Sequence, residues 1–188
     1  MPARRLDIAL LALLAAYVAT IPLANWMVQH VGTVCVPNGP CLLPVWPGVM
    51  APSGVALAGL ALVLRDLVQR RAGLGWSLAA IGLGVAVSAA IAPPALVAGS
   101  AMAFLVSELA DAAVYTPLQR RGLLVAVVAS SAVGAVVDSV VFLRLAFGSL
   151  DHVEGQIIGK LWAVGAAALL IALVRRRGAS RPGPHAPA

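Results

Sequence analysis

The sequence predicts an all-α integral membrane protein, with six transmembrane helices in one bundle and both termini in the cytoplasm. Apolar residues make up 61% of the 188 residues and charged residues only 11%, whereas soluble domains carry about a quarter charged residues. Six apolar segments each approach the length of about 20 residues that crosses roughly 30 Å of hydrocarbon. The predicted spans are Ile8–Val28, Val49–Leu67, Leu74–Ala92, Ala95–Tyr115, Leu123–Phe147 and Gln156–Val174.

Arginine residues cluster in alternate connections and set the predicted orientation. They precede the first span and follow the second, fourth and sixth, whereas the connections around residues 29–48, 92–95 and 148–155 carry no Lys or Arg. Because cytoplasmic loops are enriched in positive charge, both termini are predicted to lie on the cytoplasmic side. The predicted location is a bacterial-type inner membrane. This bias accounts for the net charge of +6, and no basic face with interleaved aromatic residues indicates a nucleic-acid partner.

The two ends of the chain receive different interpretations. The first apolar run is longer than a usual signal core and lacks a convincing small-residue cleavage site after it, so it is interpreted as a retained span. Residues 1–174 are thus predicted to form one transmembrane domain. The segment Arg175–Ala188 is rich in Pro, Gly and Arg and is predicted to be a disordered cytoplasmic tail that lies against anionic headgroups.

The long connection is Gln29–Gly48, on the predicted outer side. Its prolines exclude a long helix, and its apolar residues predict a lid or partial re-entrant segment that folds back onto the bundle. Cys35 and Cys41 lie there on the oxidising side, so they either form a disulfide or remain two free thiols. A zinc site is disfavoured because no His lies at ligand spacing from these cysteines, and no metal or cofactor is expected.

Two carboxylates inside the apolar segment 104–115 are the strongest functional signal. Glu108 and Asp111 are three residues apart and share a helix face, with Ser107 and Tyr115 each one turn from Asp111. An acid near the bilayer centre costs a few kcal/mol and is normally tolerated only where it faces the protein interior or a water-filled cavity. The stripe therefore predicts one wall of a polar site.

Further charged residues interrupt the neighbouring spans. Asp138 and Lys160 either form a buried ion pair that fixes helix register or contact a polar solute in a cavity. They lie in the outer halves of their helices, whereas the stripe lies in an inner half, so the acids are predicted to mark successive positions along a path. At the cytoplasmic edge, Arg65 and Asp66 are either a snorkelling arginine beside a solvated aspartate or part of the polar inventory inside the membrane.

No catalytic constellation assembles from the residues, so the chain is predicted not to be an enzyme. His30 and His152 lie in outer loops and His185 in the tail, which leaves no base for an intramembrane serine nucleophile. A metalloprotease helix is lacking, and the segment from Gly155 to Lys160 departs from the phosphate-loop pattern in spacing and in its final residue.

Several segments, in this order and spacing, resemble a known family. They are Pro52-x-Gly54, Arg65–Gln69 (RDLVQ), Ser107–Tyr115 (SELADAAVY), Val136–Phe142 (VVDSVVF), Leu145–Gly148 (LAFG), and Gly155-Gln156 with Lys160. Together they resemble the VUT family of vitamin-precursor or queuosine-precursor transporters, over about Pro44 to Trp162. The resemblance implies a six-helix importer of 7-cyano-7-deazaguanine or a related deazapurine, similar in fold to the substrate-binding subunits of energy-coupling-factor transporters. Ser130-Ser131 stand where members often carry Asn, which leaves the base specificity open.

The chemistry of a guanine-like base fits these residues. One carboxylate can accept hydrogen bonds from adjacent ring and amine N–H groups, so Glu108 or Asp138 is predicted to bind that edge. Asp111 is predicted to orient Ser107 and Tyr115. The candidates to donate to the ring carbonyl are Lys160, Gln156 and Asn25. The candidates to stack on the ring are Phe142, Tyr115, Trp46 and Trp162, each with plain packing or interface anchoring as the alternative.

Two other functions stay open. The chain could be a substrate-binding subunit that docks on an energising ATPase module, and the small residues of Ala12-x-x-x-Ala16 and Ala15-x-x-x-Ala19 offer a surface for such docking. It could instead be a non-transporting membrane scaffold in which the buried charges only lock the helices together.

Overall fold

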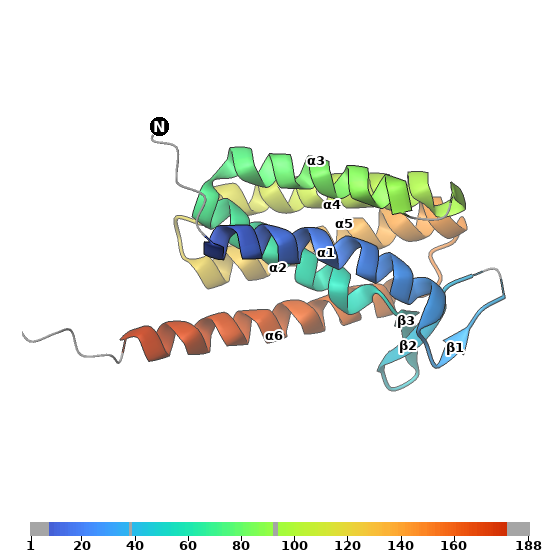
Figure 1. The fold of residues 1–188 in the computed structure, drawn as a ribbon. Helices are drawn as coiled ribbons and strands as arrows, with labels where there is room; N and C mark the ends of the chain where they lie inside the picture. Colours follow the sequence, from blue (N-terminus) through green and yellow to red (C-terminus); the bar gives the residue numbers. More distant parts are fainter. Residues whose placement is uncertain (1–7, 38, 92–93, 180–188) are drawn as a thin grey trace, which may run out of the picture.

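The structure is a computed structural model that describes residues 8–37, 39–91 and 94–179. Within these ranges it contains six helices that run roughly along one axis, with a small sheet at one end of the bundle (Figure 1). We call this end the sheet end and the opposite end the far end. The helices are α1 (Ile8–His30), α2 (Val55–Ala72), α3 (Leu74–Ile91), α4 (Pro94–Leu118), α5 (Leu123–Phe147) and α6 (Val153–Ala179).

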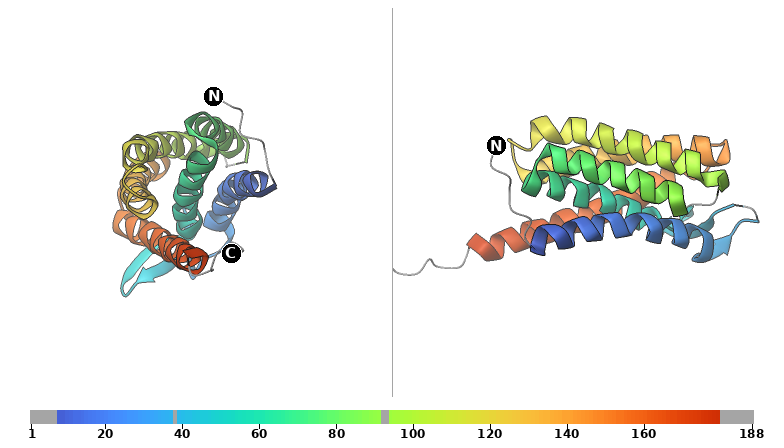
Figure 2. Two further views of the ribbon diagram at one scale, coloured as in Figure 1. Left: turned by 90° about the vertical axis from the view of Figure 1, so that its left-hand side faces the viewer. Right: turned by 45° about the horizontal axis from the view of Figure 1, so that its top comes forward.

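Helix α2 is the central element of the bundle. Viewed along the axis, it runs inside an arc made by the other helices (Figure 2), and it packs against each of α1, α3, α4, α5 and α6. It carries Arg65 and Asp66 in the middle of an otherwise apolar run. Charged side chains are costly against lipid, and the central position of α2 keeps both of these residues fully buried.

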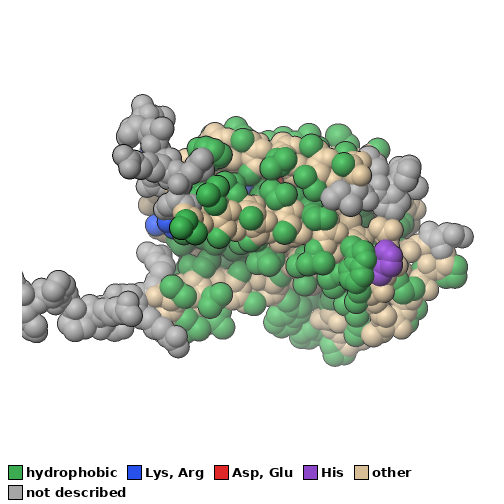
Figure 3. Space-filling view, in the orientation of Figure 1, with side chains coloured by type: hydrophobic (Ala, Val, Ile, Leu, Met, Phe, Trp, Pro, Cys, Tyr) green, Lys and Arg blue, Asp and Glu red, His purple; other side chains and the backbone are tan. Residues whose placement is uncertain are grey.

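The outward faces of the helices are apolar. Four helical segments within the described residues are long and apolar enough to cross a membrane: Ile8–His30, Ala101–Leu118, Leu123–Phe147 and Val153–Val174. Figure 3 shows one side of the bundle covered largely by hydrophobic side chains, and Leu169 and Leu170 on α6 are more than 60% exposed. Exposed apolar surface of this extent is expected against lipid, so the chain is a membrane protein. The six-span topology remains a prediction.

Strands between residues 34 and 52 form a three-stranded antiparallel sheet in the order β1-β2-β3, where the sequence predicted a lid or partial re-entrant segment over Gln29–Gly48 and the start of a helix at Val49. Its strands are β1 (Val34–Cys35), β2 (Cys41–Trp46) and β3 (Val49–Pro52), so α2 begins at Val55 and not at the predicted Val49. The pairing of Trp46 with Val49 leaves Pro47-Gly48 as the turn. Gly48 has a φ of +76°, and Pro followed by Gly is the preferred central pair of a type II turn.

The sheet folds back onto the sheet end of the bundle. Strands β2 and β3 pack against α6, and β2 also contacts α1. Cys35 and Cys41 face each other across β1 and β2 and form a disulfide. The Ser53 hydroxyl donates a 2.7 Å hydrogen bond to the backbone carbonyl of Met27. The connection between the first two helices is therefore an ordered, cross-linked cap over one end of the bundle.

Helix boundaries at the C-terminal side differ from the predicted spans. Helix α6 begins at Val153 and continues through Ala179, whereas the sequence predicted a span from Gln156 to Val174 with the tail starting at Arg175. The remainder of the predicted tail, residues 180–188, lies outside the described residues.

Close packing of α2 on α6 depends on Gly59. A Cβ at this position would lie 2.7 Å from the backbone oxygen of Lys160 and 2.9 Å from the Cβ of Ala163. Only glycine permits an approach of this kind without displacing a helix. The contact places the backbone of Lys160 directly against α2, which leaves its side chain to reach across to α5.

Candidate functional site

A cavity with a water-accessible volume of about 80 Å³ lies between α1, α2, α4, α5 and α6, in the half of the bundle near the sheet. One water molecule needs about 10–15 Å³ by this measure, so the cavity has room for several waters. Its lining is mostly apolar. The polar lining side chains are Thr20, Asn25, Ser107, Glu108, Asp138 and Gln156, and the aromatic ones are Phe104 and Phe142.

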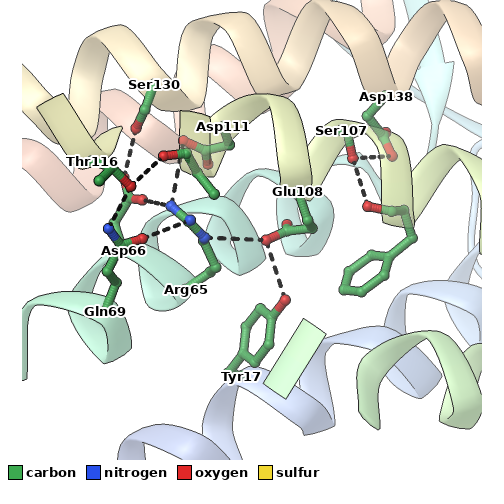
Figure 4. Close-up of polar contacts among 12 residues, drawn as sticks. Tyr17, Arg65, Asp66, Gln69, Ser107, Glu108, Asp111, Thr116, Ser130 and Asp138 are labelled. Atoms are coloured by element: carbon green, nitrogen blue, oxygen red, sulfur yellow. Dashed lines mark hydrogen bonds and ion pairs between the residues drawn. The ribbon is translucent and has the colours of Figure 1, made fainter. Parts of the chain in front are cut away.

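Glu108 lies at the boundary between this cavity and the charged interior. Its side chain lines the cavity, although the residue is only 1% exposed. Its Oε2 accepts a 3.2 Å hydrogen bond from the hydroxyl of Tyr17 and lies 4.0 Å from the Nε of Arg65 (Figure 4). Glu108 therefore contacts α1 and α2 with one carboxylate oxygen while it borders the space that a solute would fill.

The interpretation of Arg65 as a snorkelling arginine is wrong, because Arg65 and Asp66 are both fully buried. Arg65 donates to Asp66 Oδ1 at 2.5 Å through Nη1 and to Gln69 Oε1 at 2.7 Å through Nη2. Its guanidinium lies 5.7 Å from the ring centroid of Tyr115. The interpretation assumed from the charges that this part of α2 meets water at the membrane surface, whereas α2 packs against all five other described helices.

The partners of Arg65 bind the neighbouring helices. Asp66 Oδ2 accepts a 2.7 Å hydrogen bond from Ser130 on α5, and Gln69 donates a 2.9 Å hydrogen bond to Thr116 on α4 (Figure 4). We call Arg65, Asp66, Gln69, Thr116 and Ser130 the inner cluster. It joins α2, α4 and α5 on the far-end side of Glu108.

Asp111 belongs to this charged interior and not to the cavity lining. It is fully buried, and its Oδ1 lies 4.0 Å from Nη1 of Arg65. The hypothesis that Asp111 orients Ser107 and Tyr115 is wrong. The Ser107 hydroxyl instead hydrogen-bonds the backbone carbonyl of Phe104 at 3.1 Å and Asp138 Oδ1 at 3.4 Å. Asp111 faces the guanidinium on α2, whereas Ser107, one turn nearer the sheet end, faces α5.

Asp138 and Lys160 form the ion pair that was one of the two interpretations left open by the sequence. The Nζ of Lys160 hydrogen-bonds Asp138 Oδ2 and also Ser139 Oγ, the latter at 2.9 Å. Lys160 is 1% exposed, whereas the side chain of Asp138 is 19% exposed and lines the cavity. The two residues are thus an ion pair of which one member borders the cavity.

The structure gathers most of the predicted binding residues at one place. The lining includes Asn25, Ser107, Glu108, Asp138, Phe142 and Gln156, whereas Asp111, Tyr115 and Lys160 lie outside it. Since Glu108 and Asp138 border the same cavity, the prediction that the acids mark separate positions along a path does not hold for these two. Trp46 and Trp162 stack on each other at 6.0 Å, are more than half exposed and lie outside the lining.

Sequence reasoning missed several residues of the site. Tyr17 and Arg65 contact Glu108, and Phe104 and Thr20 line the cavity. A tyrosine in the middle of the otherwise apolar first span was a usable signal for Tyr17, since a buried phenol needs a hydrogen-bond partner. For Arg65, the signal was Gln69 one turn later in the same helix, because the two side chains share a face.

The match to a known family covers the helices that carry the site. Residues 85–175, about half of the chain, match the model of the family described as "Putative vitamin uptake transporter". This region includes Glu108, Asp138, Gln156 and Lys160, and the match confirms the family resemblance predicted from the sequence. No curated protein and no solved structure matches the chain.

Proposed function

We propose that this chain, of which residues 85–175 match the family described as "Putative vitamin uptake transporter", imports 7-cyano-7-deazaguanine or a related deazapurine across the cytoplasmic membrane. The family match and the four long apolar helices support transport across a membrane. The deazapurine and the inner membrane are parts of the proposal, and they rest on the chemistry of the cavity and on the arginine pattern.

The observation that carries the proposal is a cavity in which carboxylates, carboxamides and phenylalanines converge from different helices. Glu108 comes from α4, Asp138 from α5, Asn25 from α1 and Gln156 from α6. A carboxylate accepts both N–H donors of a guanine-like edge in charge-assisted hydrogen bonds, and a carboxamide supplies a donor for the ring carbonyl. Phe104 and Phe142 offer aromatic surface for the flat ring.

In this proposal, the Glu108 carboxylate accepts hydrogen bonds from the ring and amine N–H groups of the base. Its Oε2 is engaged by Tyr17 and faces Arg65, which holds the carboxylate in one orientation at the cavity wall. Lys160 is assigned an indirect role, because its ammonium group is occupied by Asp138 and Ser139 and does not line the cavity. Gln156 and Asn25 are then the donors for the ring carbonyl.

The inner cluster is assigned the role of the closed end of the transport path. The cavity is confined to residues in the sheet half of the bundle, and Arg65, Asp66 and Gln69 lie beyond Glu108 with at most 2% exposure. A solute that passed from the cavity to the far end would have to separate the contacts of α2 with Thr116 and Ser130. This arrangement fits a carrier open on one side at a time.

Uptake in cells that need an external deazapurine and lack their own importer tests the proposal. The wild-type chain should support accumulation of 7-cyano-7-deazaguanine, and Glu108→Gln should abolish it while the protein remains folded in the membrane. Glu154→Gln is the matched control, because Glu154 is exposed at the start of α6 and does not line the cavity. Unchanged uptake with Glu108→Gln would contradict the proposal, and a change in stability alone would favour the scaffold.

The exposed small residues of α1 favour a second candidate, a substrate-binding subunit of an energy-coupling-factor transporter. Ala12, Ala15, Ala16 and Ala19 are all exposed, and small residues permit close approach of another helix in the membrane. Copurification of ATPase subunits with the chain from its native membrane would support this candidate. Uptake by the purified chain alone in vesicles would exclude a need for such a module.

A further inference from the structure

We infer that Glu108 and Asp111 together form a proton-binding site, and that the chain moves this proton inward with its solute. The inference rests on the proposed function, because it assumes transport, but it does not depend on which solute fills the cavity. It follows from the surplus of buried carboxylates around one guanidinium.

Asp111 is a buried acid without a hydrogen bond. The residue is 0% exposed, and neither of its carboxylate oxygens has a hydrogen-bond partner among the described residues. A Cβ at Gly134 would lie 3.1 Å from the Cβ of Asp111, so this side chain lies directly against α5. An ionised carboxylate in such a place is strongly unfavourable unless it is paired, whereas a bound proton removes its charge.

The guanidinium next to Asp111 is committed to other groups. Arg65 donates to Asp66 at 2.5 Å and to Gln69 at 2.7 Å. Its distances to Glu108 Oε2 and to Asp111 Oδ1 are both 4.0 Å, beyond hydrogen-bond reach. Figure 4 shows the three carboxylates around this one guanidinium. If all three were ionised, the four groups would sum to a charge of −2, so the cluster favours the uptake of a proton.

Among the three acids, Asp66 has the donors that an ionised carboxylate needs. Its Oδ1 accepts from Arg65 and its Oδ2 from Ser130, and hydrogen bonds to the charged form favour that form. Glu108 and Asp111 have no such contact with a cation. They lie three residues apart on one face of α4, so they are neighbours that can share a proton.

The other titratable groups around this pair do not remove the surplus. They are Tyr17 on α1, Arg65 and Asp66 on α2, Asp138 on α5 and Tyr115 one turn further along α4. Helix α3 carries no charged residue. Lys160 on α6 is held by Asp138, so it does not compensate the pair.

The pair also connects the cavity with the inner cluster. Glu108 lines the cavity, whereas Asp111, one turn nearer the far end, does not. A proton from the outer side would therefore reach Glu108 through the cavity and pass to Asp111. Because N–H donors of a solute favour the ionised form of Glu108, solute binding would transfer the proton to Asp111, and this step couples the two.

Infrared spectroscopy of the purified full-length chain tests the proton site without any solute. Exposed carboxyls such as those of Asp151 and Glu154 are ionised at neutral pH, so the C=O stretch of a protonated carboxyl at that pH reports a buried acid. The band should be present in the wild type and in Asp151→Asn, and absent in the double variant Glu108→Gln/Asp111→Asn. Absence from the wild type, or persistence in the double variant, would overturn the inference.

Transport by the chain in lipid vesicles tests the coupling. The probe is 7-cyano-7-deazaguanine, with the membrane potential held at zero. With one proton per solute, each pH unit across the membrane should accumulate the probe about tenfold on the alkaline side, which is about 1.4 kcal/mol. A pH-sensitive dye inside the vesicles should report acidification as the probe enters. Asp111→Asn should lose both responses, and Asp151→Asn should keep them.

The outcomes separate this inference from the proposed function. Entry of the probe to equal concentrations on both sides, or accumulation that follows a sodium gradient instead, would overturn the inference and leave the proposed import intact. Binding without entry would also overturn it, because the proton gradient would then not drive the chain. Failure of the probe to bind at all would overturn the proposed substrate, and the infrared band would still decide whether the proton site exists.

Discussion

The hydroxyl of Tyr17 donates a hydrogen bond to Oε2 of Glu108 across 91 residues of sequence. This bond joins α1 to the acid at the cavity wall. Both residues are buried, Tyr17 completely and Glu108 to within 1%. The pair therefore couples the position of α1 to the orientation of the carboxylate that borders the cavity.

Tyr17→Phe should weaken solute binding and lower the stability of the protein. Loss of a hydrogen bond to a buried charged group costs about 1–3 kcal/mol, and without it the Glu108 carboxylate is free to reorient. Thermal unfolding in detergent and binding titration would measure both effects. Tyr115→Phe removes a hydroxyl outside the cavity lining and should leave the affinity unchanged. Equal losses of affinity in both variants would argue against a specific role for the Tyr17–Glu108 bond.

Arg65→Lys should destabilise the bundle although it preserves the charge. Arg65 uses two separate nitrogens for Asp66 and Gln69, and a lysine ammonium cannot reproduce this planar fork. One buried acceptor would lose its partner, at a cost of about 1–3 kcal/mol.

Circular dichroism during heating would measure that loss, with Arg121→Lys in the exposed connection between α4 and α5 as the control. An unchanged melting temperature for Arg65→Lys would show that the inner cluster contributes little to stability.

A double-mutant cycle on Asp138 and Lys160 should reveal strong coupling. Removal of one member of a buried pair leaves an uncompensated charge and destabilises by roughly 3–5 kcal/mol. The double variant should lose less unfolding free energy than the sum of the losses in Asp138→Asn and Lys160→Met, because the second change removes the charge that the first one leaves unpaired. Additive unfolding free energies would mean that the two side chains do not depend on each other.

Gly59→Ala should be destabilising although alanine favours helices. The new Cβ would meet the Lys160 backbone oxygen at 2.7 Å, and overpacking of this kind costs about 1–3 kcal/mol. Gly165→Ala in α6 is the matched control, since a Cβ there meets nothing within 4 Å. That variant should be neutral or gain about 0.5–1 kcal/mol from helix propensity. A stable Gly59→Ala protein would contradict the close approach of α2 and α6.

Cysteine labelling should test the predicted orientation. A cysteine at Leu150, which is 45% exposed in the connection between α5 and α6, should react with an impermeant reagent added to intact cells. A cysteine at Gln119, between α4 and α5, should react only after the membrane is opened. The native Cys35 and Cys41 are joined in a disulfide and should give no background. The reverse pattern would invert the topology derived from the arginines.

The helices were predictable because each depends on local composition. The fifth predicted span, Leu123–Phe147, coincides with α5, because a largely apolar segment long enough to cross the membrane has few alternatives to a helix. The sheet at residues 34–52 was missed because its strands are short and partly apolar, and the segment from Val49 continued smoothly into an apolar helix. The Pro47-Gly48 turn was the local signal that a hairpin, and not a span, begins there.

The acids of the site were predictable for the same reason, since Glu108, Asp111 and Asp138 stand out in apolar surroundings. Their partners were not. Arg65 lies in the second half of α2, and it is fully buried because α2 is enclosed by the other helices. Whether a charged residue at such a position meets water or the protein interior depends on which helices surround it, which no local pattern encodes.

The sequence by itself determined that this chain has the apolar helices of a membrane protein, that residues 85–175 match the putative vitamin uptake transporter family, and which of its residues are out of place in lipid. Hydrophobic transfer and charge burial act on each segment separately, so they can be inferred from composition. Only the tertiary structure decided that Glu108 and Asp138 share a cavity, that Asp111 turns away from it, and that Tyr17 and Arg65 hold Glu108. These relationships depend on the mutual packing of helices distant in sequence, and the close approach at Gly59 shows how a single missing side chain sets that packing.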